Sequence, residues 1–375
     1  MTPFAIAAPA RILFGRGEAA KAPALIAALG PRGIVIHGAN VGRAASMLGG
    51  LSDLGCDVSA IACPSEPTLF LLEQATALGR AHRPDWVAAI GGGAALDLGK
   101  ALAALIPAPG GAMDHLEVVG LGLPLTAAPL PFVALPTTAG TGAEATKNAV
   151  IGLPDHGRKV SLRDDRMLAR LAIVDPALTD HCPPDVTLAS GLDAITQVIE
   201  PFVSCKATPF TDALTLPAIP MGLAALIRLM KADDAAARDD LAWVSLCGGL
   251  ALANAGLGAV HGLAGVIGGM TPAAHGAVCG ALLGPVLAMN ARRGAARLDR
   301  VCAMIGDALG TPPDAAPQAL ARWAAAQGLP GLTAQGLHPR DHAAVAQAAL
   351  ASSSMKGNPV TPGLADLMQV LAQAA

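Results

Sequence analysis

The sequence predicts an α/β N-terminal domain with a parallel sheet, followed by an all-α C-terminal domain. In the first half, short apolar runs alternate with helical patterns, which is typical of a doubly wound parallel sheet. From about Pro183 onward the strand-like runs disappear, and Ala- and Leu-rich segments with helical periodicity follow. The length of 375 residues also exceeds one typical hydrophobic core. We therefore expect a first domain at 1–180 and a second at 181–375.

The expected strands of the first domain are short apolar runs bounded by Gly, Pro or Asp. They lie at 32–38, 56–63, 84–93, 131–138 and 171–176. Helical periodicity predicts helices between them, at 69–82 and 95–105.

Composition excludes several classes of partner. The formal net charge is -3, with 25 basic and 28 acidic residues, so neither a nucleic acid nor an anionic membrane is expected as partner. The seven cysteines form no CxxC pair and indicate reduced thiols in a cytoplasmic protein. No basic region precedes the apolar N-terminal residues, so no signal peptide is expected.

One long stretch, 242–292, is uncharged up to Arg292 and is long enough to suggest a membrane span. It is rich in glycine, carries Asn254 and His261, and has no flanking basic cluster. We therefore interpret it as a buried pair of core helices.

Four positions in the second half have the chemistry of a metal site. Asp193 and Gln197 lie four residues apart, so a helix places them on one face. His261 and His275 lie in the uncharged stretch. One carboxylate and two imidazoles are enough to hold a catalytic metal with an open position. Cys279, four residues after His275, could approach the site but is interpreted as an ordinary buried core cysteine.

Two polar loops follow strands of the first domain. Gly91-Gly92-Gly93 ends an apolar run and opens a helix, where free backbone N–H groups suit a phosphate. The second loop, 136–144, holds three threonines and two glycines. The glycine loop does not match GxGxxG and alone is equally compatible with an ordinary tight turn. For the second loop, composition alone slightly favours an ordinary polar turn.

Together and in this order, GGGAALDLGK and PTTAGTGAEAT resemble the iron-containing (group III) alcohol dehydrogenase family, within the dehydroquinate synthase-like superfamily. The resemblance continues through IVDPALT, ASGLDAITQVIEPF, GAVHGLAGVIGG, AAHGAVCGALL and KGNPVTPGLADLMQVL, and covers nearly the whole chain. It implies a nucleotide-binding α/β domain with a parallel sheet and an all-helical metal-binding domain.

The resemblance also implies roles for individual residues. Those that would contact NAD or NADP are Gly38, Gly91, Gly92, Gly93, Asp97, Thr137, Thr138, Thr141, Asn148 and Lys159. Those that would hold a divalent metal are Asp193, His261 and His275, with Gln197 as a weak fourth ligand through its oxygen or a hydrogen-bond donor instead. Those that would act in catalysis are Asp97, Gln197, His261 and His275.

Three positions depart from the family pattern. Gln197 stands where a fourth ligand is normally His, and Gly265 stands where many members have a His proposed for proton relay. Gly38 stands where members strict for NAD often have Asp. Without that carboxylate nothing repels a 2′-phosphate, and Arg43 could reach one, so NADP is plausible beside NAD.

The resemblance thus implies an NAD(P)-dependent oxidoreductase that interconverts a small aldehyde and its primary alcohol, as a homodimer or larger homo-oligomer. The metal is expected to be Fe²⁺ or Zn²⁺; a metal-independent maleylacetate-type reductase is the alternative, as is a dehydroquinate synthase-like lyase. Both alternatives should need basic substrate-binding residues, and 242–291 offers none. A non-enzymatic nucleotide-binding module is the remaining hypothesis.

Overall fold

The computed structural model describes residues 3–375, and the chain forms two compact units. The first, here called the α/β unit, comprises 7–138 and 142–179. The second, the helical unit, comprises 180–375, the loop residues Ala139–Thr141 and the N-terminal residues up to Ile6.

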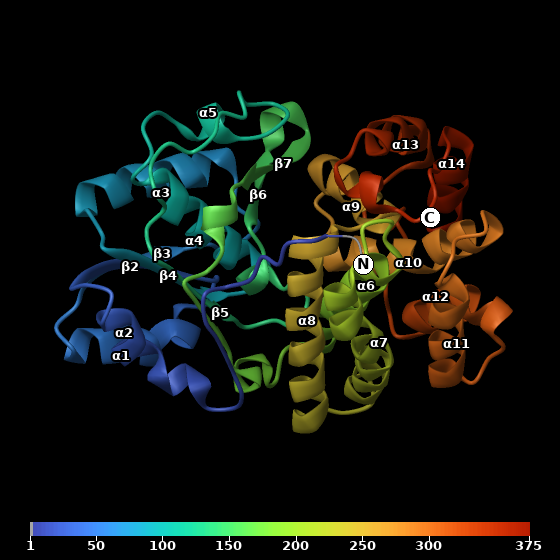
Figure 1. The fold of residues 1–375 in the computed structure, drawn as a ribbon, viewed down its shortest axis with the longest axis horizontal. Helices are drawn as coiled ribbons and strands as arrows, with labels where there is room; N and C mark the ends of the chain where they lie inside the picture. Colours follow the sequence, from blue (N-terminus) through green and yellow to red (C-terminus); the bar gives the residue numbers. More distant parts are fainter. Residues whose placement is uncertain (1–2) are drawn as a thin grey trace. The chain divides into compact units, whose positions relative to one another are not determined.

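The α/β unit contains a six-stranded parallel sheet (Figure 1). In spatial order its strands are β1 (Ile12–Phe14), β8 (Leu171–Val174), β5 (Phe132–Pro136), β4 (Trp86–Gly91), β2 (Arg32–His37) and β3 (Asp57–Ala62). The five expected strands are confirmed. Strand β1 was not predicted, because a run of three residues carries no usable periodicity.

Successive side chains along the strands enter two different cores, as the period of a strand requires. Ile34 and Ile36 of β2 pack with helices α3 (Leu69–His82) and α4 (Gly93–Leu105). Val35, between them, packs on the opposite face with α1 (Ala22–Ala27) and α2 (Ala45–Asp53). Burial on both faces explains why these strands appear in the sequence as continuous apolar runs.

An antiparallel hairpin, β6 (Asn148–Leu153) and β7 (Arg158–Arg163), lies beside α4 and was not predicted. Its position is fixed by Lys100 of α4, whose fully buried ammonium donates to the carbonyls of Ala143 and Asn148 and to Thr146 Oγ1, at 2.7–2.8 Å. A further short helix, α5 (Ala112–His115), completes this unit.

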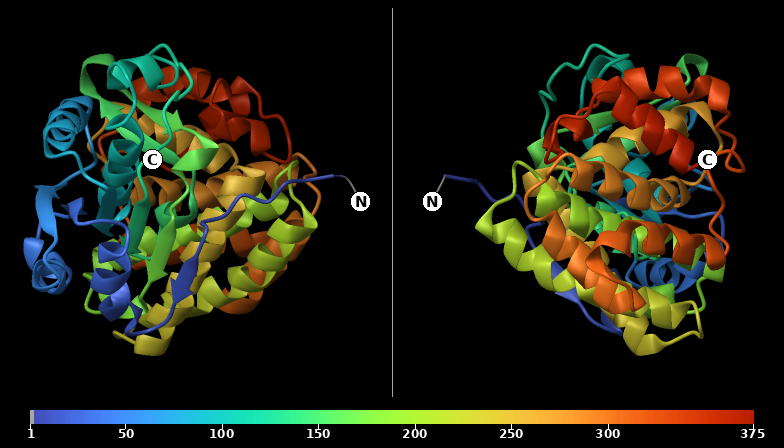
Figure 2. Two further views of the ribbon diagram at one scale, coloured as in Figure 1. Left: turned by 60° about the vertical axis from the view of Figure 1, so that its left-hand side comes forward. Right: turned by 90° about the vertical axis from the view of Figure 1, so that its right-hand side faces the viewer.

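The helical unit contains no strand among its described residues. Its helices are α6 (Pro184–Val203), α7 (Pro209–Leu229), α8 (Ala235–Ala255), α9 (Ala259–Met270), α10 (His275–Arg292), α11 (Leu298–Leu309), α12 (Ala316–Ala326), α13 (His342–Leu350) and α14 (Leu364–Gln373). Helices α6, α7 and α8 pack on one another, and α10 packs on α6, α9 and α12 (Figure 2). The expected all-helical second part is confirmed.

The uncharged stretch forms the second half of α8 together with α9 and α10. Its apolar side chains are largely buried in the protein, as expected for core helices. Two segments have the length and composition of a membrane span: α7, and α8 with α9, which are bent by 98° at their junction. Helix α7 packs on α6 and α8 of its own unit, and 44% of its most apolar window is buried.

Candidate functional site

The nucleotide-binding candidates gather where the strand order of the sheet reverses. From β2 the chain passes to β3 on one side and then crosses to β4 on the other. Open parallel sheets bind ligands outside the carboxyl ends of the strands at such a switch point. Gly38 directly follows β2, and Gly91-Gly92-Gly93 joins β4 to α4, so both flank this point.

A close approach explains the glycine at position 91. A Cβ on Gly91 would lie 2.6 Å from Ala95 Cβ and 3.4 Å from the backbone nitrogen of Gly38. Gly92 is the N-cap residue of α4, so free N–H groups of that helix face the edge of the sheet.

The threonine loop lies beside the glycine loop. Strand β5 pairs with β4 so that Pro136 stands opposite Gly91, and the Thr137 N–H donates to the Gly91 carbonyl at 2.9 Å. A Cβ on Gly92 would lie 3.4 Å from Thr138 Oγ1. Thr141, also expected at the nucleotide, belongs to the loop segment that packs with the helical unit.

The remaining cofactor candidates of the α/β unit have structural partners. Asp97 Oδ2 accepts the N–H of Val150 at 3.0 Å, and Asn148 gives its carbonyl to Lys100. Lys159 forms an ion pair with Glu66. These contacts hold α4, β6 and β7 in place, and they leave the expected cofactor contacts of Asp97, Asn148 and Lys159 as predictions.

Helix α6 carries the first part of the metal-site candidate. Asp193, Gln197 and Glu200 follow one another at spacings of four and three, so they line one face. All three side chains are buried, with exposed fractions of 1%, 2% and 4%.

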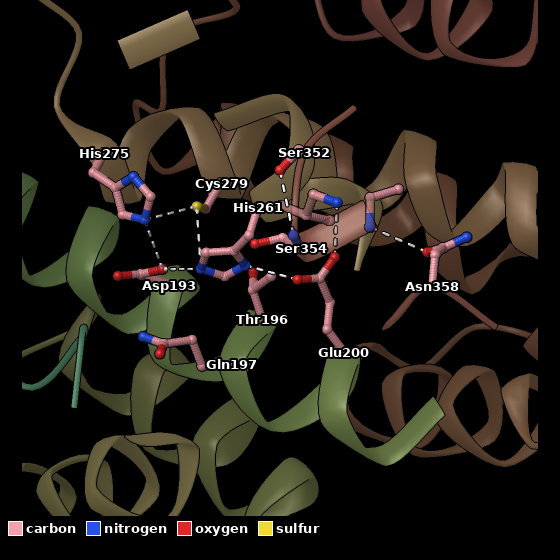
Figure 3. A network of polar contacts seen from close by, with 12 residues as sticks. Asp193, Thr196, Gln197, Glu200, His261, His275, Cys279, Ser352, Ser354 and Asn358 are labelled. Carbon is pink, nitrogen blue, oxygen red and sulfur yellow. Dashed lines mark hydrogen bonds and ion pairs between the residues drawn. The ribbon is translucent and has the colours of Figure 1, made fainter. Parts of the chain in front are cut away.

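Four side chains from three helices converge on one point (Figure 3): Asp193 of α6, His261 of α9, and His275 and Cys279 of α10. One ligand atom from each lies within 4.8 Å of the others. Asp193 Oδ1 is 3.3 Å from His261 Nε2 and 3.8 Å from His275 Nε2. Cys279 Sγ is 3.8 Å from His261 Nε2 and 3.6 Å from His275 Nε2. We call this group the four-residue cluster.

A carboxylate outside the cluster fixes the ring of His261. Glu200 Oε2 lies 2.7 Å from His261 Nδ1, and Glu200 Oε1 accepts the Val260 N–H at 2.7 Å. Because a carboxylate accepts at this distance, Nδ1 carries a proton, and a metal that displaced the proton on Nε2 would find the Nε2 lone pair directed into the cluster. Metal-binding histidines are commonly oriented by such a carboxylate.

The C-terminal segment supports the same helix end. Asn358 Oδ1 accepts the Ala259 N–H at 3.1 Å, so two side-chain oxygens satisfy the first turn of α9. Gly258 is needed there, because a Cβ would lie 2.8 Å from Glu200 Oε1 and 3.0 Å from Asn358 Oδ1.

The charges of the cluster favour a cation. Burial lowers the pKa of His261, but Cys279 and Asp193 raise it to well above its ordinary value. Cys279 and Asp193 also raise the pKa of His275 to about 9, against a smaller effect of burial. Burial raises the pKa of Asp193, while the two imidazoles lower it overall. A metal ion would take the place of the protons that this cluster attracts.

The donor set fits a divalent metal ion. Asp193 Oδ1 is buried, and none of the described residues donates a hydrogen bond to it, although two imidazole nitrogens lie within 3.8 Å. A buried carboxylate oxygen without a donor, beside two imidazole nitrogens, is an arrangement that a bound metal ion would satisfy. The side chain of His275 is 32% exposed, which leaves this side of the cluster accessible.

Gln197 lies next to the cluster but is engaged elsewhere. Its Nε2 donates to the carbonyl of Gly140 at 2.8 Å, in the loop segment that packs with the helical unit (Figure 3). The backbone passes close behind, since a Cβ on Gly248 of α8 would lie 2.9 Å from Gln197 Cβ. The amide therefore ties a loop to α6.

Two participants were misjudged or missed from the sequence. Cys279 was interpreted as a core cysteine; the structure corrects this, because its thiol lies inside the cluster. Its spacing of four from His275 on α10 was the available signal. Glu200 was missed, although its spacing of seven from Asp193 predicts the same helix face.

Gly265 occupies an exposed position one turn after His261 on α9, and a Cβ there would meet nothing within 4 Å. The structure therefore has room for the side chain that many family members carry at this point.

Comparison with known proteins agrees with this architecture. The chain matches "Iron-containing alcohol dehydrogenase" over residues 9–176 and "Fe-containing alcohol dehydrogenase family, C-terminal" over 187–375. It is similar to long-chain-alcohol dehydrogenase 1 of Geobacillus thermodenitrificans, with 41% identity over 56% of this chain and 53% of that protein. It is similar to probable alcohol dehydrogenase EutG of Salmonella typhimurium, with 33% identity over 83% of this chain and 78% of that protein.

Among solved structures, 1,3-propanediol oxidoreductase superposes with a TM-score of 0.91 at 25% identity, over the full length of both chains. The sheet, the helical unit and the sequence matches lead to one conclusion: the chain belongs to the iron-containing alcohol dehydrogenase family.

Proposed function

We propose that this enzyme is an NAD(P)-dependent, metal-assisted dehydrogenase that interconverts a small aldehyde and its primary alcohol. The observation that carries the proposal is Asp193 Oδ1, a buried carboxylate oxygen that receives no hydrogen bond from residues 3–375 and lies near the Nε2 atoms of His261 and His275. In the proposed enzyme Asp193, His261 and His275 hold the metal.

The chemical demand is hydride transfer between C4 of the nicotinamide and the carbonyl carbon. Reduction builds negative charge on the carbonyl oxygen, and a divalent metal held by the cluster would supply a Lewis acid there. Glu200 keeps the proton of His261 on Nδ1, so that Nε2 stays available. Because Gly265 has no side chain, water would bring the proton to the alcohol oxygen.

The cofactor would bind with its pyrophosphate at Gly91, Gly92 and Gly93, where the N-terminus of α4 favours negative charge. Thr137 and Thr138 adjoin that position and would contact the nucleotide. At Gly38 a side chain would meet open space, and the exposed Arg43 follows five residues later in the short 3-10 helix Val41–Ala44. This combination accepts a 2′-phosphate, so we propose that NADP is used as well as NAD.

A small or polar substrate is supported by composition, because aromatic residues make up 2% of the chain and offer few flat surfaces for an aryl group. Small aldehydes or alcohols are the proposed partners. A cytoplasmic location and a homodimer or larger homo-oligomer complete the proposal.

The test is oxidation of NADH and NADPH against short aldehydes by wild-type enzyme and the D193N variant. Asn has nearly the shape of Asp but no charge to balance the ion, so turnover should fall at least about a hundredfold. Equal turnover by both proteins would contradict the metal-assisted mechanism. Binding of NAD(P)H without turnover of any aldehyde would favour the non-enzymatic module.

A further inference from the structure

We propose that Cys279 is the fourth protein ligand of the metal, in the place that Gln197 leaves open, and that the resulting carboxylate–imidazole–thiolate set selects zinc. This inference rests on the proposed function, because it concerns how the same metal is held. It changes the ligand chemistry from three hard-to-borderline donors to a set that includes one soft sulfur.

The distances within the cluster support four ligands around one ion. In a tetrahedral zinc site with bonds of about 2.0–2.1 Å to nitrogen or oxygen and about 2.3 Å to sulfur, the edges are about 3.3 Å for N···O and about 3.6 Å for N···S. The structure has N···O edges of 3.3 and 3.8 Å and N···S edges of 3.8 and 3.6 Å. The other two edges are no longer than 4.8 Å, so shifts on the order of an ångström or less would bring all four atoms around one ion.

Helix geometry explains why Cys279 reaches this point. His275 is the first residue of α10, and Cys279 lies one turn later on the same face. Its side chain is fully buried, and its sulfur lies within 4 Å of both imidazole Nε2 atoms. The residue thus meets Asp193 and the imidazoles rather than an apolar neighbourhood.

Gln197 is less suited to the fourth position because its NH₂ group is held by Gly140, which fixes the orientation of the amide. Its Nε2 donates to the Gly140 carbonyl. Because a carbonyl oxygen can only accept, the NH₂ group of Gln197, and not its oxygen, must point toward Gly140. The position that carries a ligand in the family pattern thus serves the loop segment Ala139–Thr141. In this chain the missing ligand is supplied from α10 by Cys279.

The charges and softness of the set favour zinc. One carboxylate and one thiolate balance a divalent ion, while the two imidazoles stay neutral. Thiolate ligands select zinc over hard divalent ions, and zinc accepts mixed sulfur, nitrogen and oxygen ligands in a tetrahedral arrangement. Tetrahedral zinc can expand to five ligands, so an oxygen of the substrate remains compatible with the set.

Cobalt substitution tests the inference directly. Metal-free enzyme is titrated with Co²⁺, and the spectrum is recorded for wild type, C279S and the control C302S, which removes a buried thiol on α11 outside the cluster. We expect a sulfur-to-cobalt charge-transfer band in wild type and C302S. In C279S the band should be lost, and Co²⁺ should bind at least about tenfold more weakly.

The outcomes separate the inference from the proposed function. Stoichiometric Co²⁺ binding without a charge-transfer band, or a band that persists in C279S, would overturn the Cys279 ligand and leave the three-ligand site. No uptake of Co²⁺ or Zn²⁺ by wild type would overturn both. X-ray absorption of zinc-loaded wild type needs no variant: it should detect one sulfur at about 2.3 Å, and nitrogen and oxygen neighbours alone would contradict the inference.

Discussion

The replacement of Glu200 by Gln tests how the cluster is organised. Glu200 accepts two N–H groups at 2.7 Å, one from His261 Nδ1 and one from Val260. A glutamine has nearly the same shape but only one oxygen for these two donors. If the oxygen faces Val260, its NH₂ group faces Nδ1 and forces the imidazole proton onto Nε2, where it blocks the metal. If the amide is reversed, the buried Val260 N–H loses its acceptor.

For either orientation of the glutamine amide, the loss of stability or of metal affinity can be estimated. A buried donor left without a partner costs about 1–3 kcal/mol. Losses of metal affinity on removal of a carboxylate behind a ligand are about 10–100-fold, or about 1.4–2.7 kcal/mol. We therefore expect E200Q to bind zinc about 10–100-fold more weakly than wild type.

The assay is competition for zinc between the metal-free enzyme and a chromophoric chelator at fixed pH. The control is T215V, which removes a buried hydroxyl that donates to the Thr211 carbonyl in α7. T215V should keep wild-type zinc affinity. Zinc affinity of folded E200Q within about twofold of wild type would refute the role assigned to Glu200.

Three further predictions concern the α/β unit. K100M should lower the free energy of unfolding in urea by about 3 kcal/mol, because it removes three hydrogen bonds from one buried ammonium and leaves the Asn148 carbonyl without that donor; a loss below about 1 kcal/mol would contradict this. Burial raises the pKa of Glu144 from 4.5 to about 7. Its contribution to stability is thus present below pH 4.5 and lost as the pH rises to about 7. Relative to E144Q, wild type should lose on the order of 3 kcal/mol across that window, and parallel pH curves would show the reasoning to be wrong. G38D should shift the preference in kcat/KM toward NADH over NADPH by at least about tenfold, because a carboxylate repels the 2′-phosphate; an unchanged ratio would place the ribose elsewhere.

The strands of the parallel sheet could be predicted because each leaves a signal within its own short segment of sequence. Strands buried on both faces must be continuous apolar runs, and β4, at Trp86–Gly91, is recognisable for that reason. The hairpin β6–β7 could not be anticipated, because its position beside α4 depends on a hydrogen bond from Val150 to Asp97 and on the distant ammonium of Lys100. Interactions of this kind join segments about fifty residues apart and leave no periodic signal.

The candidate site also contains residues that the sequence predicts and one that only tertiary packing identifies. Asp193, His261 and His275 were recognisable from residue type and from resemblance to a family. Cys279 has a spacing that predicts a shared face with His275, but only tertiary packing brings that face to His261 on another helix. A buried cysteine in a core and a buried cysteine in a metal site have the same sequence environment.

The most direct test of the account measures metal content and activity on the same samples. Enzyme purified without chelator is titrated with a zinc chelator, and metal per chain is determined by elemental analysis beside the rate of NAD(P)H oxidation with a short aldehyde. The account predicts close to one divalent ion per chain, activity that falls in proportion to the ion removed, and recovery on addition of Zn²⁺. Full activity in a preparation that holds far less than one ion per chain would contradict it.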